Sequence, residues 1–597
     1  MTEVDSETRL SFSQKIWRPR SQVTDHYKQL ARNCGLSPLF TPIIAYQQLD
    51  DEEKVERYFR PLLKHLTDPA QLLDMDLAVA RLIQAIEGGE KLAVFGDFDV
   101  DGATSSALMV RYFRWLGIPI RVYIPDRLTE GYGPNPQAMK TLQEEGISLV
   151  VTVDCGITAF EALAEAKRLG LDVIVTDHHQ GRESLPDAVA LINPNRLDET
   201  FPHKELAGVG VAFYLVMALN RALRTTGFFT SRPEPDLREL LDLVAVGTIV
   251  DVASLTGVNR PLVSVGMRVA RESKNLGLNA LMETARIKGS LSAGQVGFQI
   301  GPRINAGGRL GKGPLGSELL HTEDPQRAEQ IAAELEEANR ERRALEDKML
   351  RQAMAKIELM GLEPSKRTLV LAETGWHSGV IGIIASRLSD RFHRPTVIIA
   401  LDEEGNGKGS ARSIPGIDLL LAIEACGPLL VGFGGHKAAA GLSIEAAQVA
   451  AFAEAFEKAV VAENHPSLFR PAMTYDGRLQ IPDVNLETVG RLERLQPFGR
   501  ANPEPVFLIE QVRLMDARAI KESHVKCRLV DLHDNAIDTI AFRVLPGGLG
   551  EGLLQQGLWV DVVGSLSINR FRNRETVQLI IRDARPAKGH DLTVNGR

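Results

Sequence analysis

The chain has 597 residues and a mass of 65.4 kDa, which exceeds what one hydrophobic core can organise and predicts roughly three to five domains. Hydrophobic residues make up 44% and charged residues 24%, and these ordinary globular values exclude wholesale disorder and fibrous folds. The net charge of −8 gives no overall attraction to nucleic acid, so a polyanionic partner would need a local basic groove.

Neither a membrane span nor a secretory signal is expected. The longest apolar runs have about eight residues, whereas crossing a bilayer takes about 20, and residues 1–20 lack an apolar segment. The cysteines lie far apart, which fits a reducing compartment and excludes a disulfide scaffold or a cysteine-rich zinc site: they are Cys34, Cys155, Cys426 and Cys527. We therefore expect a cytoplasmic protein without membrane partners.

An alternation of strands and helices begins after an N-terminal segment, residues 1–70, that carries little recognisable chemistry. Apolar runs at Leu92–Phe95, Ser148–Val153 and Val173–Thr176 alternate with amphipathic helical stretches. This alternation predicts βαβ units and a mostly parallel sheet, in a domain that covers residues 71–321.

Residues 322–361 predict a single long helix. Asp324 and Pro325 suit the N-cap and the first helical position, and neither Gly nor Pro interrupts the pattern before Gly361. Roughly 36 helical residues would span about 54 Å. A solvated helix packed on one lobe is the alternative, but strand-like runs resume directly afterwards, at Thr368–Leu371, and favour a connector between two lobes.

Two further domains complete the predicted fold. Residues 362–465, rich in Gly and Ala, indicate a smaller α/β unit. Residues 466–590 contain several short strand-like runs, which favour a small OB-like β-barrel or a sandwich. The predicted fold class is α/β: a parallel-sheet domain, joined by a long helix to a smaller α/β domain and followed by an OB-like β-barrel.

An acidic cluster follows the first strand of the predicted sheet. The segment Gly96–Gly102 holds Asp97, Asp99 and Asp101 within five residues. One aspartate would suffice to cap the next helix, and three close carboxylates repel one another. A bound cation is the simplest compensation.

Three more apolar runs end at side chains that bind metals. Leu149–Val153 is followed by Asp154, Val173–Thr176 by Asp177-His178-His179, and Leu243–Val250 by Asp251. A lone Asp or His at such a place is usually a helix cap or an ordinary polar group. Ligands gather outside the carboxyl ends of parallel strands, so four corresponding positions predict one shared site.

The residue types indicate which ion such a site would hold. Carboxylates and imidazoles without thiolates suit Mn²⁺ or Mg²⁺ better than structural zinc. This many carboxylates exceed the need of one ion, so we expect two ions about 3.5–4 Å apart, which would assist an in-line displacement at phosphorus. His178 and His179 are neighbours in sequence and are expected to point in different directions, one to metal and one to phosphate.

These motifs resemble those of the DHH phosphoesterase superfamily. The four segments are Gly-Asp-Phe-Asp-Val-Asp-Gly, Val-Asp-Cys-Gly-Ile, Asp-His-His and Ile-Val-Asp-Val-Ala. The resemblance implies a catalytic metal centre whose ligands are Asp99, Asp101, Asp154, His178 and Asp251, with Asp97 adjoining. It also places His179 near the scissile phosphate. Many members have a histidine where this chain has Phe95, and Asp97 is the candidate to take over its role.

Three glycine-rich segments are candidate phosphate-binding loops. Gly434-Gly435-His436-Lys437 resembles the glycine-histidine motif of DHHA1 domains, and the tight loop around Ser410 and Arg412 could grip an anion. The turn Gly301–Arg309 adds Arg303, Asn305 and Arg309. Each segment alone would more often be an ordinary surface turn, and the combination favours phosphate binding.

The C-terminal region suggests a polymeric substrate. Its strand-like runs carry many basic residues, and the cluster Asn569–Arg574 places Phe571 among arginines, which suits stacking and backbone neutralisation along a single strand. A charge run of this kind is usually a solvated loop, so the segment alone is modest evidence. Tyr132 could stack on a base or could simply pack on its own lobe.

The order of these domains resembles the RecJ family of bacterial single-strand-specific exonucleases. The segment Leu495–Gly499, with Asn502-Pro503, is similar to the linker before the barrel in that family. The resemblance implies 5′→3′ digestion of single-stranded DNA with Mn²⁺ or Mg²⁺, a role in DNA repair and recombination, and single-strand-binding protein and a helicase as partners. It assigns Ser410 and Arg412 to the 5′-phosphate, and the arginines and asparagine of residues 301–309 to the strand.

Two rival interpretations stay open at this point. A phosphodiesterase for short oligonucleotides or cyclic dinucleotides would not need the barrel. A non-catalytic relative that only binds DNA or replication proteins would be expected to have lost several metal-site acids, all of which are present here.

Overall fold

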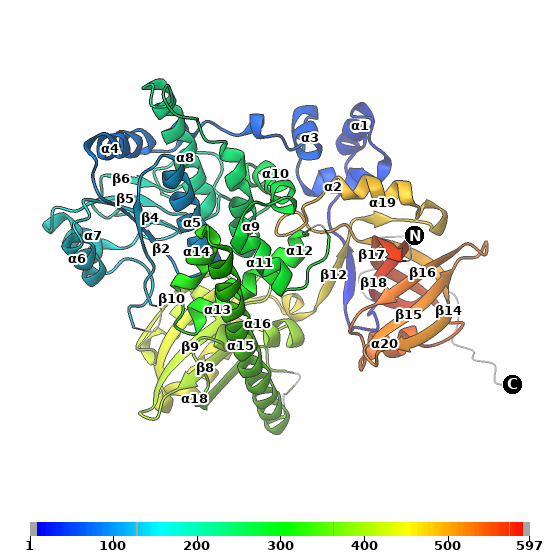
Figure 1. The fold of residues 1–597 in the computed structure, drawn as a ribbon. Helices are drawn as coiled ribbons and strands as arrows, with labels where there is room; N and C mark the ends of the chain where they lie inside the picture. Colours follow the sequence, from blue (N-terminus) through cyan, green and yellow to red (C-terminus); the bar gives the residue numbers. More distant parts are fainter. Residues whose placement is uncertain are drawn as a thin grey trace. The chain divides into compact units, whose positions relative to one another are not determined.

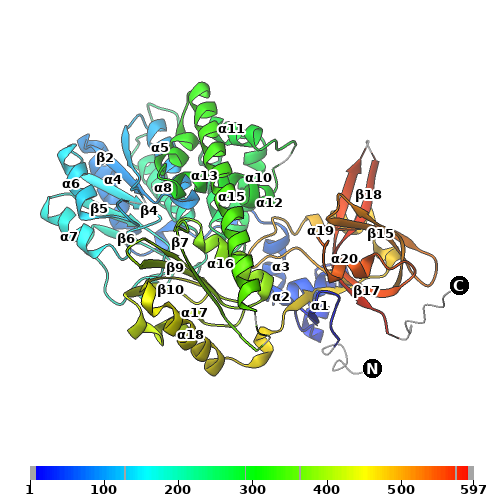
Figure 2. The same cartoon turned by 90° about the horizontal axis from the view of Figure 1, so that it is seen from below.

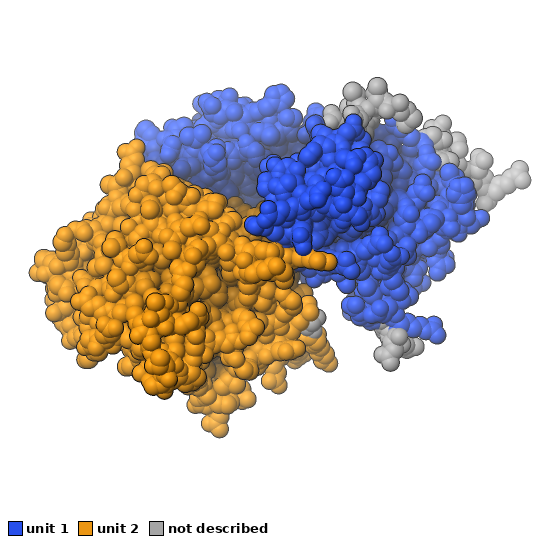
Figure 3. Space-filling model, turned by 90° about the horizontal axis from the view of Figure 1, so that it is seen from above, with its two compact units in different colours: residues 1–59, 345–496, 504–597 blue, residues 60–344, 497–503 orange. Residues whose placement is uncertain are grey.

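A computed structural model describes residues 9–126, 129–289, 291–361, 363, 365–571 and 574–588. The chain divides into two compact units, which Figure 3 colours separately. Unit 1 consists of Met1–Phe59, Leu345–Gln496 and Glu504–Arg597, and unit 2 of Arg60–Ala344 and Pro497–Pro503.

Unit 2 is built on a five-stranded parallel sheet with strand order β3-β2-β4-β5-β6 (Figure 1). Its strands are β2 Leu92–Gly96, β3 Ile120–Tyr123, β4 Leu149–Val153, β5 Asp172–Thr176 and β6 Ala190–Ile192. The register pairs Gly96 with Val153 and Val153 with Thr176, so the central strands end level with one another. The residues that follow these strands therefore emerge side by side.

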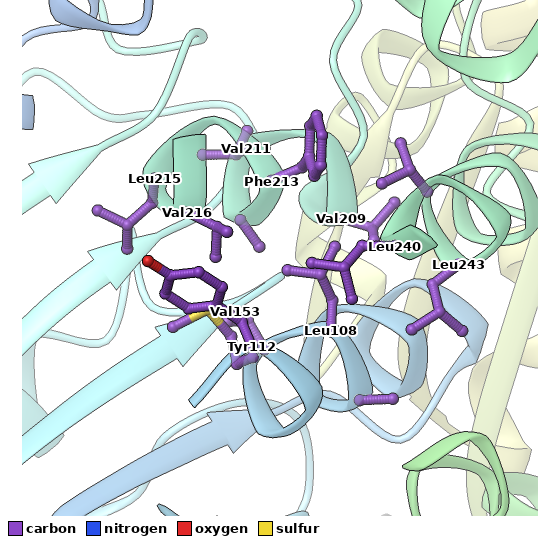
Figure 4. Packing of buried hydrophobic residues seen from close by; sticks show 14 of the residues in the cluster. Leu108, Tyr112, Val153, Val209, Val211, Phe213, Leu215, Val216, Leu240 and Leu243 are labelled. Carbon is purple, nitrogen blue, oxygen red and sulfur yellow. The ribbon is translucent and has the colours of Figure 1, made fainter. Parts of the chain in front are cut away.

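The two faces of this sheet pack into separate cores because side chains alternate along each strand. Leu92 and Val94 point into a large core shared with α5 (Val100–Trp115), α8 (Gly208–Thr225) and α9 (Leu241–Val250). Figure 4 shows part of this core, where Val153 lies beside Tyr112, and Val209 and Leu240 lie near Leu108.

The other sheet face carries Ala93 and Phe95, which pack with α6 (Pro136–Glu144) and α7 (Phe160–Arg168). The phenyl ring of Phe95 is fully buried and stacks on Tyr123 with 5.3 Å between ring centroids. Phe95 is therefore a core residue.

The remaining helices of unit 2 correct two predictions. They are α4 Met75–Gly88, α10 Asn259–Arg271, α11 Leu276–Thr284, α12 Ala293–Gln295, the π-helix η6 Val296–Ile300, α13 Gly301–Arg309 and α14 Pro314–His321. The run before Asp251 is helix α9 and not another strand: it is apolar because helices α5, α8 and α10 surround it. The expected glycine-rich turn over 301–309 is helix α13, since its glycines allow close packing on neighbouring elements.

Helix α15 covers Pro325–Met360 and confirms the predicted long helix (Figure 2). Ile331 and Leu335, near its start, belong to the core of unit 2. Met349 and Ile357, near its end, belong to a core of unit 1. The helix therefore contributes to both units, as expected of a connector.

Unit 1 contains a second, mixed sheet with strand order β10-β11-β9-β8-β7. The strands are β7 Leu369–Thr374, β8 Thr396–Leu401, β9 Asn406–Arg412, β10 Gly432–His436 and β11 Ala439–Glu445, and the helices are α16 Ile381–Phe392, α17 Leu419–Glu424 and α18 Val449–Glu463. The segment that holds Ser410 and Arg412 is strand β9 and not the tight loop that its glycines suggested. Gly407 lies against Ile399 and Ile444, and Gly409 lies against Leu442 and Ile399. These neighbours are so close that a side chain at either glycine would clash with them.

The C-terminal part of unit 1 is a closed five-stranded barrel. Strands β14 Phe507–Ile520, β15 His524–Val530, β16 Ala536–Ala541, β18 Arg574–Pro586 and β17 Trp559–Phe571 pair in this order, and β17 pairs back to β14. The short strand β13 (Gly477–Arg478) pairs in parallel with the first two residues of β14. Helix α19 (Leu486–Glu493) lies between β13 and β14 in the sequence, and α20 (Gly548–Leu553) lies between β16 and β17. Closure removes the free strand edges.

The N-terminal segment has a structural role that its sequence did not reveal. Strand β1 (Ile16–Pro19) pairs in parallel with β12 (Ala472–Tyr475). The Trp17 indole is buried, donates a hydrogen bond of 3.0 Å to Asp583 and lies under the Arg585 guanidinium. Helices α1 Asp25–Asn33, α2 Thr41–Tyr46 and α3 Glu52–Phe59 follow β1. The start of the chain thus completes the packing of the barrel.

Among the described residues, no helix combines the length and the apolar character that crossing a membrane requires.

Candidate metal centre and phosphate-binding residues

The first acidic motif turns directly from strand β2 into helix α5. Asp97 is buried in this turn. Asp99 is the N-cap of α5, and its Oδ1 accepts hydrogen bonds from the backbone N–H groups of Asp101 and Gly102 at 2.9 and 3.1 Å. A single aspartate caps the helix, so Asp97 and Asp101 are left for another role.

Backbone donors at the start of helix α8 hold Asp101. Its two carboxylate oxygens accept hydrogen bonds from the N–H groups of Gly208 and Val209 at 2.7 and 2.8 Å, where the helix dipole favours negative charge. A Cβ atom on Gly208 would lie 2.7 Å from Asp154 Oδ1, so glycine permits the close approach of this helix. Asp154 itself has φ +61°, a left-handed conformation that is costly for a residue with a side chain and is frequent at functional sites.

The Asp-His-His triplet follows strand β5, and its aspartate is an internal anchor. The buried carboxylate of Asp177 accepts hydrogen bonds from the N–H groups of Ile157, His178 and His179. It also contacts His179 Nδ1 at 2.7 Å. Asp177 thereby fixes the loop and the orientation of the His179 ring.

His178 lies at the centre of the carboxylates. Its Nε2 is 3.1 Å from Asp154 Oδ1, 3.8 Å from Asp101 Oδ2 and 4.0 Å from Asp251 Oδ2. Asp251 is the C-cap of helix α9 and reaches the same place from a helix end. The predicted acidic and imidazole side chains from distant segments are therefore brought together.

The two histidine rings do not point apart as expected. Their centroids are 4.7 Å apart, and a nitrogen of each lies within 4.8 Å of one Asp154 oxygen. The loop held by Asp177 turns both rings to the same side. They differ in exposure: the His178 side chain is 15% exposed and that of His179 is 48% exposed.

Burial and mutual repulsion dominate the electrostatics of the cluster. Burial raises the pKa of Asp101 and Asp154 well above the ordinary range, and neighbouring carboxylates raise each further. Burial and Asp99 raise the pKa of Asp251 to about 7. Burial, and next the charge of His179, lower the pKa of His178 to about 4, which leaves the neutral imidazole that a metal ligand requires.

These residues fit divalent cations by their donor set and by their lack of counter-charge. Among the described residues, no Lys or Arg side chain lies within 4.0 Å of the carboxylates of Asp99, Asp101, Asp154 or Asp251. Two groups share no residue, and within each the candidate ligand atoms lie within 4.8 Å of one another: Asp101, His178 and Asp251, and Asp97, Asp99 and Asp154. Oxygen and imidazole donors of this kind suit Mn²⁺ or Mg²⁺.

Tyr132 lies at the edge of this cluster, in the loop between β3 and α6. Tyr132 as a whole residue is 56% exposed, and its hydroxyl is 3.4 Å from the Asp154 carbonyl and 3.3 Å from either ring nitrogen of His179. Phe98 meets it edge-on with 6.4 Å between centroids. The tyrosine thus contacts the cluster and remains exposed to solvent.

The three polar residues of helix α13 lie in different environments. Asn305 Oδ1 accepts a hydrogen bond of 3.1 Å from the N–H of Val100, directly after Asp99. Arg303 is buried, 2.6 Å from a Glu336 oxygen, and also donates to the Gln299 carbonyl. Arg309 is half-buried in the last turn. Asn305 therefore braces the acidic motif, and Arg303 faces α15 and not solvent.

A half-buried guanidinium forms a second polar site, on the sheet of unit 1. Arg412 Nη1 donates to Ser410 Oγ at 3.0 Å, and burial lowers the pKa of this guanidinium. Among the described residues, no carboxylate lies within 4.0 Å of it. A Cβ on Gly382 would be 2.9 Å from Arg412 Nη2 and 3.1 Å from Ser410 Oγ, so the first turn of α16 adjoins both side chains. Helix N-termini and arginines both favour anions.

His436 lies at the end of the exposed strand β10, in the same sheet. Its Nδ1 accepts a hydrogen bond of 3.3 Å from the N–H of Ala438. Strand β11 separates β10 from β9, the strand of Ser410 and Arg412. These three predicted residues therefore share a sheet without forming one contact group.

The basic residues of the barrel are mostly at its surface, with one clear exception. Arg518, Lys521, Arg543, Arg570 and Arg574 are exposed. Arg585 is 4% exposed and pairs with Asp561, so it holds the barrel together. Arg572, in the aromatic-basic cluster, lies outside the described residues.

Sequence reasoning missed several residues that support these sites. Asp177 looked like part of a motif, but only the fold shows that it anchors a loop. Helices α8 and α16 each have a glycine in the first turn, Gly208 and Gly382. This glycine was the one feature of the sequence that could have indicated that these helix starts adjoin the two sites. That signal is weak because helix starts with glycine are common without any ligand.

Comparison with known proteins agrees with this geometry. Residues 91–248 match the DHH family N-terminal domain, residues 365–462 the DHHA1 domain and residues 475–583 the RecJ OB domain. A single-stranded-DNA-specific exonuclease RecJ from Bacillus subtilis (strain 168) is 37% identical over 591 residues, which cover 98% of this chain and 72% of that protein.

Two solved structures extend the likeness to the fold. RecJ from Thermus thermophilus in complex with Mn²⁺ matches with a TM-score of 0.79 and 31% identity, covering 96% of this chain and 80% of that one. The Mg²⁺ complex of RecJ from the same organism matches with a TM-score of 0.75 and 29% identity, covering 96% and 78%. The chain therefore belongs to the RecJ family.

Proposed function

We propose that this chain is a 5′→3′ exonuclease that hydrolyses single-stranded DNA with the help of two divalent cations. One observation carries the proposal: Asp101, Asp154 and Asp251 converge on His178 at the carboxyl edge of the parallel sheet, and no Lys or Arg among the described residues lies within 4.0 Å of these three carboxylates. Such a cluster needs cations from outside the chain. Membership of the RecJ family supports single-stranded DNA as the substrate.

Mn²⁺ or Mg²⁺ would be held as a pair. The two disjoint ligand groups, one around Asp251 and one around Asp99, support two positions, with Asp154 and His178 close to both. When bound, such ions activate water and neutralise the charge that builds up on phosphate oxygens. The chain itself supplies fixed carboxylates, so little reorganisation is needed at the moment of reaction.

His179 and Tyr132 are the proposed contacts to the scissile nucleotide. Asp177 binds His179 at Nδ1, which leaves Nε2 to donate a hydrogen bond to a phosphate oxygen. The exposed ring of Tyr132 would stack on the base beside it. Both side chains would orient the substrate.

The Arg412 site is proposed to hold the terminal 5′-phosphate. Its guanidinium lacks a carboxylate partner among the described residues, and Ser410 and the first turn of α16 add donors. A phosphate would supply the missing negative charge. His436, on the same sheet, is a further candidate contact.

The barrel would bind the strand away from its end. Its exposed basic residues suit contacts with the sugar-phosphate backbone. Of the helix α13 residues, Arg309 stays a candidate strand contact, whereas Asn305 and Arg303 contribute through the packing described above. We propose a role in DNA repair and recombination, with single-strand-binding protein and a helicase as partners.

One digestion panel tests this proposal. The full chain is incubated with single strands labelled at the 5′ or the 3′ end, a duplex and an RNA strand, with Mn²⁺, with Mg²⁺ and with chelator. We expect rapid release of the 5′ label as mononucleotide from single-stranded DNA, with either metal and not with chelator. Release of the 3′ label first, or equal digestion of the duplex, would contradict the proposal.

The same panel addresses the rival substrate class. A phosphodiesterase for short oligonucleotides or cyclic dinucleotides should digest a dinucleotide faster than a long strand. We expect the reverse, because the barrel can contact only a strand of several nucleotides.

A further inference from the structure

A short segment of the chain packs beside the acidic cluster although its flanks belong elsewhere. Pro497–Pro503, which we call the clip, is part of unit 2, whereas Gln496 and Glu504 on either side of it are part of unit 1. The clip is a closed turn: the N–H of Gly499 donates to the carbonyl of Asn502 at 2.9 Å, and the reverse bond is 3.2 Å long. The buried Asn502 amide also donates to the Pro497 carbonyl at 2.7 Å. The segment therefore holds its own shape.

The clip binds the loop that follows Asp251. The N–H of Leu255 donates to the Arg500 carbonyl at 2.9 Å, and Arg500 Nη1 donates to the Val252 carbonyl at 3.3 Å. A Cβ on Gly499 would lie 2.7 Å from a Leu255 methyl group, so glycine is needed for this contact. The clip therefore contacts residues 252–255 through main-chain hydrogen bonds, through a side-chain hydrogen bond and through packing.

This loop is strained at the residue next to Asp251. Val252 has φ +59°, which is especially unfavourable for a β-branched side chain. Its own side chain is 56% exposed and cannot hold this conformation by packing. Backbone hydrogen bonds from Val252 to Ile249 and from Ala253 to Thr248 support the turn, and Arg500 binds the Val252 carbonyl. Conformations of this kind persist only where surrounding contacts impose them.

We propose that Arg500 is a positioning residue that holds the Val252 turn and thereby keeps Asp251 in place to bind a divalent cation. This inference rests on the proposed function. It also gives the clip a purpose, because a segment between two stretches of unit 1 would help to set a metal ligand of unit 2.

The test measures Mn²⁺ binding directly in the full-length protein. Free Mn²⁺ is followed by its paramagnetic resonance signal while Mn²⁺ is added to metal-free protein carrying Arg500→Ala, Arg500→Lys or, as a matched control, Arg494→Ala. Arg494 is an exposed arginine just before the clip. We expect Arg500→Ala to weaken Mn²⁺ binding about 10-fold, the lower end of the loss that follows removal of contacts outside the ligands of a metal site. Arg500→Lys should restore part of the affinity, and Arg494→Ala should change nothing.

A second substitution tests the strain itself. Glycine adopts positive φ without cost, so Val252→Gly should make the turn less dependent on Arg500. The loss of Mn²⁺ affinity caused by Arg500→Ala should therefore be smaller in a Val252→Gly background than in the unaltered protein. Equal losses in both backgrounds would overturn the link between Arg500 and the turn.

Kinetics separate this role from a direct contact with DNA. At saturating Mn²⁺, Arg500→Ala should leave the KM for a single strand unchanged. Unchanged Mn²⁺ binding with a raised KM would replace the proposal with a phosphate contact, and no change in either would reject it. Failure of the unaltered protein to bind Mn²⁺ or to digest single strands would instead reject the proposed function.

Discussion

The acidic cluster of unit 2 and the Arg412 site of unit 1 pose the same physical problem with opposite charge. In the first, the buried carboxylates of Asp101 and Asp154 have no Lys or Arg partner within 4.0 Å among the described residues, and burial raises the pKa of both. In the second, the half-buried guanidinium of Arg412 has no carboxylate partner among them, and burial lowers its pKa. Buried charges without partners are costly unless a ligand supplies the opposite charge. The sign of each site therefore predicts its ligand, cations for one and a phosphate for the other.

The two sites also differ in how they are built. The acidic cluster collects residues from four separate segments and includes a left-handed aspartate. The Arg412 site needs only one strand and the adjoining start of a helix. We expect substitutions in the first to abolish the chemistry and substitutions in the second to change which strand ends are preferred.

The largest effect is expected for Asp154→Asn. Asparagine tolerates the left-handed conformation that alanine would strain, so the change tests the charge and little else. Hydrolysis of single-stranded DNA should fall at least about 100-fold, because several kcal/mol of charge stabilisation depend on the ligands. Binding of the strand should persist, as measured by fluorescence anisotropy.

Stability provides a control for that variant. With chelator present, Asp154→Asn should melt at the same temperature as the unaltered protein or higher, since it removes one of several repelling charges. Asp187→Asn, at an exposed site of the same unit, should alter neither activity nor melting. Full activity in Asp154→Asn would show that Asp154 does not bind the ions.

A smaller and more selective effect is expected for Arg412→Gln. Hydrogen bonds to a charged group contribute about 1.5–3 kcal/mol, so digestion of a 5′-phosphorylated strand at low concentration should slow about 10- to 100-fold. A 5′-hydroxyl strand should be digested at nearly the original rate. The control is Lys408→Gln, at an exposed position of the same strand. An equal slowing on both strand ends would mean that Arg412 does not recognise the phosphate.

Asn305→Ala should have a moderate effect on the acidic site only. It leaves the N–H of Val100 without its acceptor, at a cost of about 1–3 kcal/mol, and it loosens the segment that carries Asp99. We expect activity to fall about 10-fold and preference for the 5′-phosphate to stay unchanged. Asn279→Ala, which removes an exposed asparagine elsewhere in unit 2, should leave activity intact. A lost 5′-phosphate preference would break the separation between the two sites.

The smallest effect concerns pH and the metal-free protein. The pKa of Asp251 is about 7 in the folded chain, against about 3.9 for an unfolded aspartate. Between these values the folded state holds the extra proton, so this group's contribution to stability falls as pH rises from 4 to 7 and is constant above that. In chelator, the melting temperature of the unaltered protein should fall relative to that of Asp251→Asn over this range. Parallel pH curves would contradict the assignment.

Much of the fold and of the acidic site could be predicted from the order of the amino acids. The alternation of strands and helices predicted the parallel sheet, and an uninterrupted amphipathic pattern predicted helix α15. The carboxylates that follow β2, β4 and β5 indicated the acidic site. These features are local, because the period of a strand or helix and the residue that ends it are written in consecutive positions.

Other features became visible only in the folded chain. The apolar run before Asp251 fits a strand and a helix equally well. A fully buried element has no polar face, so its sequence shows neither the period of a strand nor that of a helix. The glycines of residues 301–309 and 407–409 looked like turns, but they serve close packing of a helix and a strand. Several contacts join residues that are far apart in the chain. They are the ion pair between Arg303 and Glu336, the hydrogen bond from Val100 to Asn305, and the contact of Arg500 with Val252. Such contacts depend on how whole elements pack, and no local pattern records them.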